Sequence, residues 1–220
     1  KLLPSASIVA PRSHHRYTLG FENWGEPLMA YDSLRDFLAS LEKAGQLVRV
    51  SRPVSTVLEM TEIQTRLLAD GGPAVLFENA VVGNGQPCVM PVLVNLFGTV
   101  ARVALGMERE PADLRELGET LAFLRQPEPP GGWREALDLI PMLRTALHMK
   151  PKTISKAPVH DVVYTGNDID LAKLPVQTCW PGEPAPLITW PLVVTKGPGD
   201  SREDDFNLGI YRMQVTGRDT

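Results

Sequence analysis

The sequence is poor in the residues on which several protein classes depend. Its 220 residues include only 2 cysteines and 4 histidines. Cys88 and Cys179 lie far apart and show no C-x-x-C spacing, which argues against a disulfide scaffold and favours a reducing compartment. The histidines have no clear metal-ligand pattern and stand at positions 14, 15, 148 and 160. We therefore expect both cysteines to be free thiols, and the sequence gives no indication of a histidine-based metal site.

The chain also lacks a strong charge of one sign and a long apolar run. Lys and Arg total 22 against 26 Asp and Glu, a formal net charge of −4, and the basic residues are scattered among acidic ones. Nucleic-acid binding needs clustered basic residues, so we expect no nucleic-acid partner. No apolar run approaches the roughly 18 residues that span a bilayer. The hydrophobic fraction of 43% is enough to form a core. Together with the free cysteines and the absence of a long apolar run, it leads us to expect a soluble, cytoplasmic protein with no membrane span.

General catalytic motifs are mostly absent. The sequence contains no P-loop, no G-x-S-x-G, no G-x-G-x-x-G and no H-E-x-x-H. Any chemistry must therefore rest on features that are less general than these motifs.

Residues 1–28 differ from the rest of the chain. They have no clear period, contain several turn formers and lack the apolar centre of a signal peptide. Met29 then opens MAYDSLRDFL, which is typical of a natural start. We expect residues 1–28 to be a leader, a start assigned too early or sequence added by cloning. The alternative is that packing orders part of this segment.

Residues 29–150 predict an α/β domain, because helical and strand patterns alternate along them. The first helix should begin after Ser33, which forms a capping box with Asp36, and should end at Gly45. The other elements follow from apolar periodicity. We expect further helices at 58–69, 99–107, 113–124 and 132–148, and strands at 46–50, 74–78 and 89–95.

The pattern changes at residue 151, where helical periods give way to short β-like runs punctuated by Pro and Gly. This change predicts a second, mainly antiparallel domain over residues 151–220. The loop GPGDSREDD (197–205) is expected to connect a hairpin. The expected strands are VHDVVY, LPVQTCW, LITWPLVVTK and FNLGIYRMQV.

The stretch DFNLGIYRMQV carries polar groups beside an apolar ladder. Alternate residues of a strand share a face, so Asn207, Gly209 and Tyr211 would share one face. Ile210 and Arg212 would share the other face if no bulge intervenes. One interpretation is an edge strand whose Arg212 is solvated and whose Asn207 caps a turn. The other is a cleft, in which Arg212 binds a carboxylate or phosphate and Asn207 binds a hard cation.

Four separated blocks of the sequence resemble the UbiD family of decarboxylases, and they occur in the family's order. The blocks are YDSLRDFLASLEKAGQLVRVSRPV, GGPAVLFENA with MPVLVNLFGTVARVALGM, LPVQTCWPGEPAPLITWPLVVTK, and NLGIYRMQV. The resemblance covers essentially all of residues 30–215. It implies an α+β protein, in which the N-terminal α/β domain is followed by the first strands of a split β-barrel of the FMN-binding kind.

The resemblance also implies a chemistry. The family uses prenylated FMN, made by a flavin prenyltransferase, to remove CO₂ reversibly from aromatic or α,β-unsaturated carboxylic acids. The flavin phosphate is held through Mn²⁺ with a K⁺ nearby, and the proteins form homo-oligomers. We therefore expect a prenyl-FMN-dependent decarboxylase to which this chain contributes the N-terminal domain and part of the cofactor site.

Site residues are implied where this sequence matches the family's motif. Asn207 matches the family's asparagine metal ligand. Arg212 matches an arginine beside the flavin and the substrate carboxylate, which makes it the catalytic candidate. The expected flavin contacts, with Trp190 and Pro191 beside them, are Thr189, Gly209, Ile210, Tyr211 and Arg212.

The matching stops before the rest of the family's site. The family's His and Glu metal ligands and its proton-donating Glu would follow beyond Thr220, so we expect the chain to be a trimmed protein, a natural truncation or one piece of a split enzyme. The alternative function is a non-catalytic subunit that acts as an assembly or scaffold module. Half a barrel would expose strand edges and apolar faces, which favour association.

Overall fold

The computed structural model describes part of the chain, namely residues 31–125, 132–133, 140, 154–198 and 206–220. The chain divides into two compact units, a smaller one of residues 1–27 with 115–148 and a larger one of residues 28–114 with 149–220. Residues 1–28 and most of the helix expected at 132–148 lie outside the described residues. Of the helices that are described, none is long and apolar enough to cross a membrane.

The smaller unit is described mainly through one helix. The helix expected at 113–124 is present as α4 (Leu114–Arg125). Within it the Thr120 hydroxyl donates to the carbonyl of Glu116, 3.0 Å away. Thr120 is buried. Its hydroxyl is nevertheless hydrogen-bonded, because it reaches the carbonyl of the preceding helical turn.

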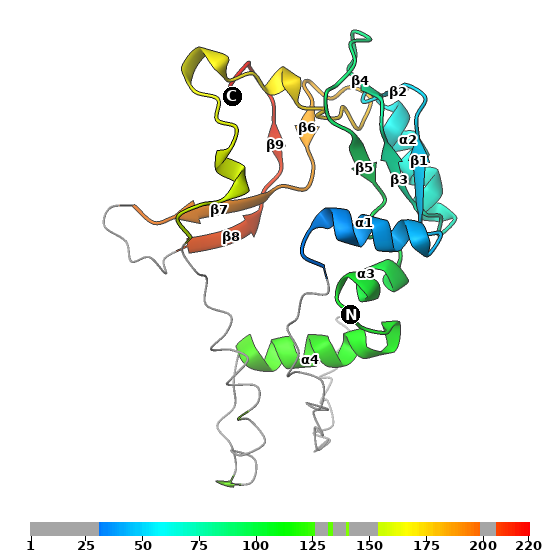
Figure 1. Cartoon of the computed structure of the whole chain (residues 1–220), viewed down its shortest axis with the longest axis vertical. Coiled ribbons are helices and arrows are strands. Elements are labelled where there is room, and N and C mark those ends of the chain that lie inside the picture. The colour runs from blue at the N-terminus through cyan, green and yellow to red at the C-terminus, as the bar shows by residue number, and fades with distance from the viewer. Residues whose placement is uncertain (1–30, 126–131, 134–139, 141–153, 199–205) are drawn as a thin grey trace, which may run out of the picture. The chain divides into compact units, whose positions relative to one another are not determined.

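The first half of the larger unit alternates helices and strands, as the sequence predicted (Figure 1). The expected helices and strands are present, with ends moved by a few residues. Two short strands, β2 and β4, were not predicted. The elements are α1 (Leu34–Lys43), β1 (Leu47–Val50), β2 (Val54–Ser55), α2 (Glu59–Ala69), β3 (Ala74–Phe77), β4 (Ala80–Val81), β5 (Val92–Val94) and α3 (Val100–Gly106).

Helix α1 begins and ends at the residues that the sequence indicated. The Ser33 hydroxyl accepts a hydrogen bond from the backbone N–H of Asp36 at 3.4 Å and donates to the Asp36 carboxylate at 2.7 Å. After the helix, Gly45 has φ +67°, a left-handed conformation that costs glycine little. Phe37 and Leu41 form the buried side of the helix.

The three-stranded sheet has the order β1-β3-β5, with β1 parallel and β5 antiparallel to β3. All four residues of β3 are buried. Ala74 and Leu76 pack in a cluster with Phe37 and Leu41 of α1. The alternate residues of β3 pack in a second cluster with Met60 of α2. Helices therefore cover both faces of the sheet, which explains a strand that is apolar at every position.

The second half of the larger unit is built from short turns and two pairs of strands. VHDVVY is not a strand, and that prediction is wrong: it begins in a 3₁₀ turn, Pro158–His160, and its valines are exposed. LPVQTCW contributes only isolated bridges at Gln177 and Thr178. The strands are β6 (Leu187–Ile188), β7 (Leu192–Lys196), β8 (Phe206–Ile210) and β9 (Met213–Gln214).

These four strands form two arms that run side by side (Figure 1). One arm contains β6 and β7, and the other contains β8 and β9. β7 pairs with β8 and β6 pairs with β9, both antiparallel. Most of the connection expected at 197–205 lies outside the described residues, although Lys196 and Phe206 on its two sides are paired. The continuous strand expected over 206–215 is wrong, because it is interrupted between β8 and β9. The described residues form four small sheets and no closed barrel.

Candidate functional site

The interruption of the two arms is the central feature of the candidate site. The paired residues that flank it are Ile188 with Met213 on one side and Leu192 with Ile210 on the other. Between them, the three residues Thr189–Pro191 lie across from only two, Tyr211 and Arg212. Unequal arms force a local break in the ladder, as in a β-bulge, and such breaks redirect side chains. We call these five residues the hairpin break.

Gly209 leaves room for the ring of Tyr211. A Cβ atom at position 209 would overlap the Tyr211 ring, so a side chain there would displace that ring. Gly209 pairs with Val193 in the β7–β8 ladder. Gly209 and Tyr211 therefore share a face, as the sequence predicted, although the strand ends at Ile210 between them.

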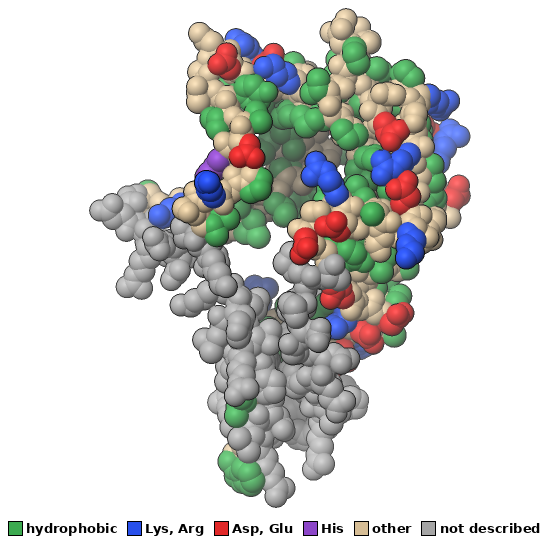
Figure 2. Space-filling view, viewed as in Figure 1, with side chains coloured by type: hydrophobic (Ala, Val, Ile, Leu, Met, Phe, Trp, Pro, Cys, Tyr) green, Lys and Arg blue, Asp and Glu red, His purple; other side chains and the backbone are tan. Residues whose placement is uncertain are grey.

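The other face of β7 and β8 is apolar and exposed. Figure 2 shows apolar side chains at the surface of the described residues. Ile210 lies on this face at the edge of the hairpin break. The exposed fractions are 67% for Leu192, 63% for Val194, 65% for Leu208 and 58% for Ile210. Such a face is a surface for a ring system or for another apolar element.

The structure brings some of the expected site residues together and leaves one apart. Thr189, Tyr211 and Arg212 lie on facing arms of the hairpin break, and all three are exposed. Gly209 and Ile210 adjoin it in β8. Asn207 instead lies farther along β8, where it pairs with Thr195.

Sequence reasoning missed Thr195 as a neighbour of Asn207. The two residues face each other in the β7–β8 ladder, so their side chains leave the same face of the hairpin. The pairing register depends on both strands and could not be derived from either one. The run LVVTK shows no alternation of polar and apolar residues, so it gave no signal of this pairing.

The described residues do not by themselves make a metal site around Asn207. No group of three His, Cys, Asp or Glu side chains within the described ranges could hold a metal ion. The amide of Asn207 and the hydroxyl of Thr195 are neutral, whereas Mn²⁺ sites use carboxylate ligands. We therefore derive no step through a metal.

The residues around the hairpin break do suit a flavin. The exposed apolar surface of Leu192 and Ile210 could carry a planar ring, and the hairpin break beside it contains Arg212 and Thr189. A flavin nucleotide needs both features, because its ring is apolar and its phosphate is anionic. The donor set is thus compatible with the cofactor that the resemblance implies.

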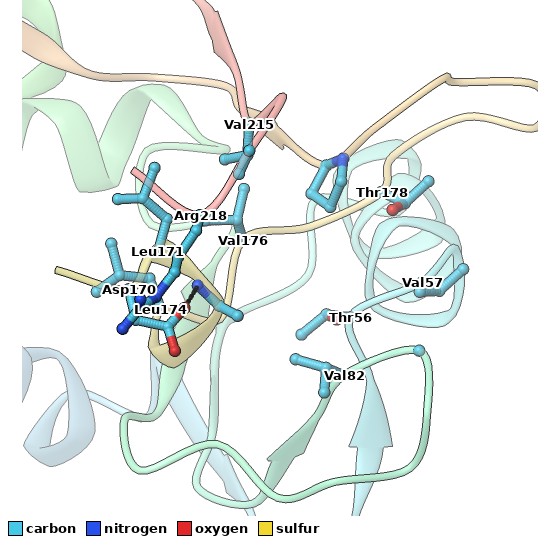
Figure 3. Close-up of a pocket in the computed structure, with 14 residues that line it drawn as sticks. Thr56, Val57, Val82, Asp170, Leu171, Leu174, Val176, Thr178, Val215 and Arg218 are labelled. Atoms are coloured by element: carbon cyan, nitrogen blue, oxygen red, sulfur yellow. Dashed lines mark hydrogen bonds between the residues drawn. The ribbon is translucent and has the colours of Figure 1, made fainter. Parts of the chain in front are cut away.

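A separate pocket is lined by residues other than those of the hairpin break (Figure 3). It has a volume of about 390 Å³, and its lining residues are Thr56, Val57, Val82, Gly83, Asp170, Leu171, Ala172, Leu174, Val176, Thr178, Pro186, Val215, Gly217 and Arg218. Arg218 lines it but donates a hydrogen bond to the carbonyl of Asn167. Asp170 lines it too, and its carboxylate accepts from the backbone N–H of Ala172. None of the expected site residues lines this pocket.

Two models of one family match the two halves of the chain. The 3-octaprenyl-4-hydroxybenzoate carboxy-lyase N-terminal domain, UbiD_N, matches residues 38–121. The 3-octaprenyl-4-hydroxybenzoate carboxy-lyase Rift-related domain, UbiD, matches residues 152–220. The second match contains the whole hairpin.

Solved structures of UbiD-class enzymes are similar over most of the chain. An evolved dimeric form of HmfF from Pelotomaculum thermopropionicum in complex with prFMN is 28% identical, with a TM-score of 0.60 over 86% of this chain and 37% of that one. HmfF in complex with FMN is 29% identical, with a TM-score of 0.58 over 84% of this chain and 35% of that one. Vanillic acid decarboxylase from Sedimentibacter hydroxybenzoicus in closed form is 27% identical, with a TM-score of 0.59 over 86% and 36%.

This chain therefore spans little more than a third of the length of these structures. The likeness covers 84–86% of this chain. Since both family models match in order, and the similar structures are of the same class, the chain belongs to the UbiD family.

Proposed function

We propose that this chain carries the flavin-facing part of a carboxy-lyase site. The reaction is the reversible removal of CO₂ from an aromatic or α,β-unsaturated carboxylic acid with prenylated FMN. The observation that carries the proposal is the hairpin break, which sets Thr189 and Arg212 on facing arms. This break lies within the region matched by the UbiD model, and a similar structure was solved with prFMN.

Arg212 is proposed to bind the substrate carboxylate. Its guanidinium presents a planar fork of donors that matches a carboxylate with two parallel hydrogen bonds. The side chain is exposed at the hairpin break, so a ligand can reach it. Thr189 lies on the opposite arm and can donate its hydroxyl to the flavin. Ile210 supplies an apolar contact for the flavin ring.

The chain's own residues orient the reacting bond. When bound, prenylated FMN supplies the electron sink for the pair of electrons left when the carbon–carbon bond to the carboxylate breaks. Arg212 holds the carboxylate in place until that bond breaks and neutral CO₂ departs. A proton then takes the place of the carboxylate on carbon. We assign no proton donor among the described residues.

The proposal extends to the architecture and the partners of the whole protein. The hairpin would form the first strands of a split β-barrel, and its exposed apolar face would be the inner surface of that barrel. Asn207 would supply one ligand to Mn²⁺, with K⁺ nearby and the other ligands from outside the described residues. The whole protein would be a cytoplasmic homo-oligomer that receives its cofactor from a flavin prenyltransferase.

Isotope exchange tests this function. The protein is produced together with a flavin prenyltransferase, and labelled CO₂ is exchanged into a panel of aromatic and α,β-unsaturated acids. Arg212→Ala should lower exchange by about a hundredfold, because a hydrogen bond to a charged group contributes roughly 1.5–3 kcal/mol. Arg52→Ala is the matched control, since Arg52 is an exposed arginine on the connection between β1 and β2. Absence of exchange with every acid, in protein whose absorbance shows bound prenylated flavin, would refute the proposal.

A non-catalytic assembly role is the second candidate, and the exposed apolar face of β7 and β8 favours it. Leu192 and Leu208 are each about two-thirds exposed, at 67% and 65%. An assembly module should associate through this face without flavin. Leu208→Ser should then abolish association measured by sedimentation, while the wild-type protein shows no isotope exchange. Association that persists in Leu208→Ser would contradict this candidate.

A further inference from the structure

Four aromatic rings lie in a row that ends at the hairpin break. The ring centroids of Tyr31 and Phe37 are 4.9 Å apart, and those of Phe37 and Phe97 are 6.0 Å apart. Phe97 then meets Trp190 edge to face, with 6.1 Å between centroids and an interplanar angle of 86°. This is a preferred geometry for an aromatic pair. Trp190 belongs to the hairpin break, so the row joins the helical layer to the candidate site.

Phe97 is presented by a turn that several contacts hold in place. Asn95 has φ +57° at the start of this turn, and its side-chain amide donates to the carbonyls of Gly72 and Pro73 at 3.1 and 2.9 Å. Arg102 donates to the carbonyls of Asn95 and Leu96 at 3.1 and 2.9 Å. The backbone that leads into Phe97 is therefore held in place.

Glycines leave space around this turn. A Cβ atom at position 98 would overlap the Asn95 side chain. A Cβ atom at position 106 would lie 3.2 Å from the Phe97 ring and 3.4 Å from the Phe37 ring. The absence of a side chain at Gly106 therefore leaves space that the Phe97 and Phe37 rings adjoin, and on another side Phe97 meets the Trp190 ring.

The other end of the hairpin break is tied to the same layer by the backbone. The N–H of Thr178 donates to the carbonyl of Thr56 at 3.1 Å, and the carbonyl of Thr178 accepts from Leu58 at 2.9 Å. The adjacent Gln177 accepts from Leu187 of β6 at 2.8 Å. Thr189 thus lies between the backbone bond at Leu187 and Trp190, the residue that makes the aromatic contact.

We propose that Phe97 is a positioning residue for the flavin site. By holding Trp190, it sets the position of Thr189 opposite Arg212. This inference rests on the proposed function, because the site that Phe97 positions is the one proposed to bind flavin. It assigns a role in cofactor binding to a residue of the N-terminal domain, far from the hairpin in the sequence.

The contact itself can be tested without any ligand. The protein is grown with fluorotryptophan, and Trp190→Phe identifies the fluorine resonance of Trp190 by its loss. Phe97→Leu should shift this resonance, because it removes a ring that lies edge to face with Trp190. Tyr31→Leu is the matched control, since it removes a ring from the same row without touching Trp190. An unchanged Trp190 resonance in Phe97→Leu would overturn the inference.

FMN titration then tests the positioning role. Phe97→Leu should bind FMN about two- to tenfold more weakly than the wild type, the range expected for one aromatic pair. Phe97→Tyr keeps the ring and should restore binding, and Tyr31→Leu should bind as the wild type does. Trp190→Leu should weaken binding as Phe97→Leu does, and the two changes together should weaken it no further.

The outcomes separate this inference from the function on which it rests. If Arg212→Ala weakens FMN binding and Phe97→Leu does not, Phe97 has no positioning role and the proposed function stands. If the wild-type protein binds no FMN, the proposed function fails and the inference fails with it. If Phe97→Leu does not fold, the exposed Trp190, at 63%, still permits the test through Trp190→Leu. Normal FMN binding by Trp190→Leu would then refute the inference.

Discussion

Arg102 is the buried charge whose removal should have the largest local effect. Its side chain is only 1% exposed, and it lies in α3 behind the turn that presents Phe97. Burial lowers the pKa of its guanidinium, yet an arginine remains charged in proteins. Its three hydrogen bonds go to Asn95, Leu96 and Gln46. We consider Arg102→Met, which keeps the apolar stem and removes the charge.

The expected loss of stability depends on what happens to the three hydrogen-bond acceptors when the guanidinium is removed. Gln46 is exposed, so its amide can turn to water at little cost. The carbonyls of Asn95 and Leu96 are held beside the buried guanidinium and would lose charged partners worth roughly 1.5–3 kcal/mol each. The methionine recovers part of this through apolar burial, about 1–2 kcal/mol. We expect a net loss of about 3 kcal/mol in the local free energy of unfolding. Lysine should recover little of it, because an ammonium cannot reach three acceptors in the arginine's planar arrangement.

Native-state hydrogen exchange measures this local stability. Amides in the 92–106 segment should exchange on the order of a hundredfold faster in Arg102→Met, since 1.36 kcal/mol is a factor of ten. Arg66→Met is the matched control, because Arg66 is 77% exposed and pairs with Glu62 one turn away. Such a pair contributes roughly 0.3–0.5 kcal/mol. If Arg102→Met accelerates exchange no more than Arg66→Met does, the reasoning about the buried guanidinium is wrong.

Three further predictions concern the core, the acid response and the thiols. Phe77→Ala removes a ring that is 1% exposed and should cost roughly 3–5 kcal/mol in urea unfolding, and a loss under about 1 kcal/mol would contradict the described core. Arg49 lowers the pKa of Glu42 through a hydrogen bond, so the stability from this pair is full above the ordinary value of 4.5 and is lost as the pH falls through the lowered value. Arg49→Gln should therefore unfold with a melting temperature that falls less on acidification, and an unchanged pH profile would argue against the pair. Burial raises the pKa of the Cys179 thiol, so iodoacetamide should modify it at least about tenfold more slowly in the native protein than in urea, as peptide mass spectrometry can measure. Equal rates in both states would refute its burial.

The sequence predicted best those features that depend on neighbouring residues. Ser33 and Gly45 mark the two ends of α1, because capping and left-handed turns act within a few residues. The apolar run of β3 predicted a strand, and the structure shows that all four of its residues are buried. The resemblance to the UbiD family added the candidate site residues, which no pattern of spacing supplied.

Features that depend on a distant partner were not predictable in this way. The run VHDVVY has strand-forming residues, but Val162 and Val163 are 67% and 69% exposed and pair with no described strand. Strand propensity reflects packing against partner strands, so the sequence of this run alone could not show whether it forms a strand. The break at Tyr211 arises from unequal lengths of two arms. Buried Arg102 was also missed, because arginine is exposed in most proteins.

The position of the core along the chain bears on how the protein is synthesised. Every residue of the two core clusters lies between residues 31 and 105, including the partly buried residues packed against them. The three-layered half can therefore close while the hairpin is still inside the ribosome. The hairpin would then emerge onto a surface that already presents the backbone of Thr56 and Leu58. The finished half then offers Thr178 its backbone partners at once, while the apolar face of β7 and β8 stays exposed and available for association.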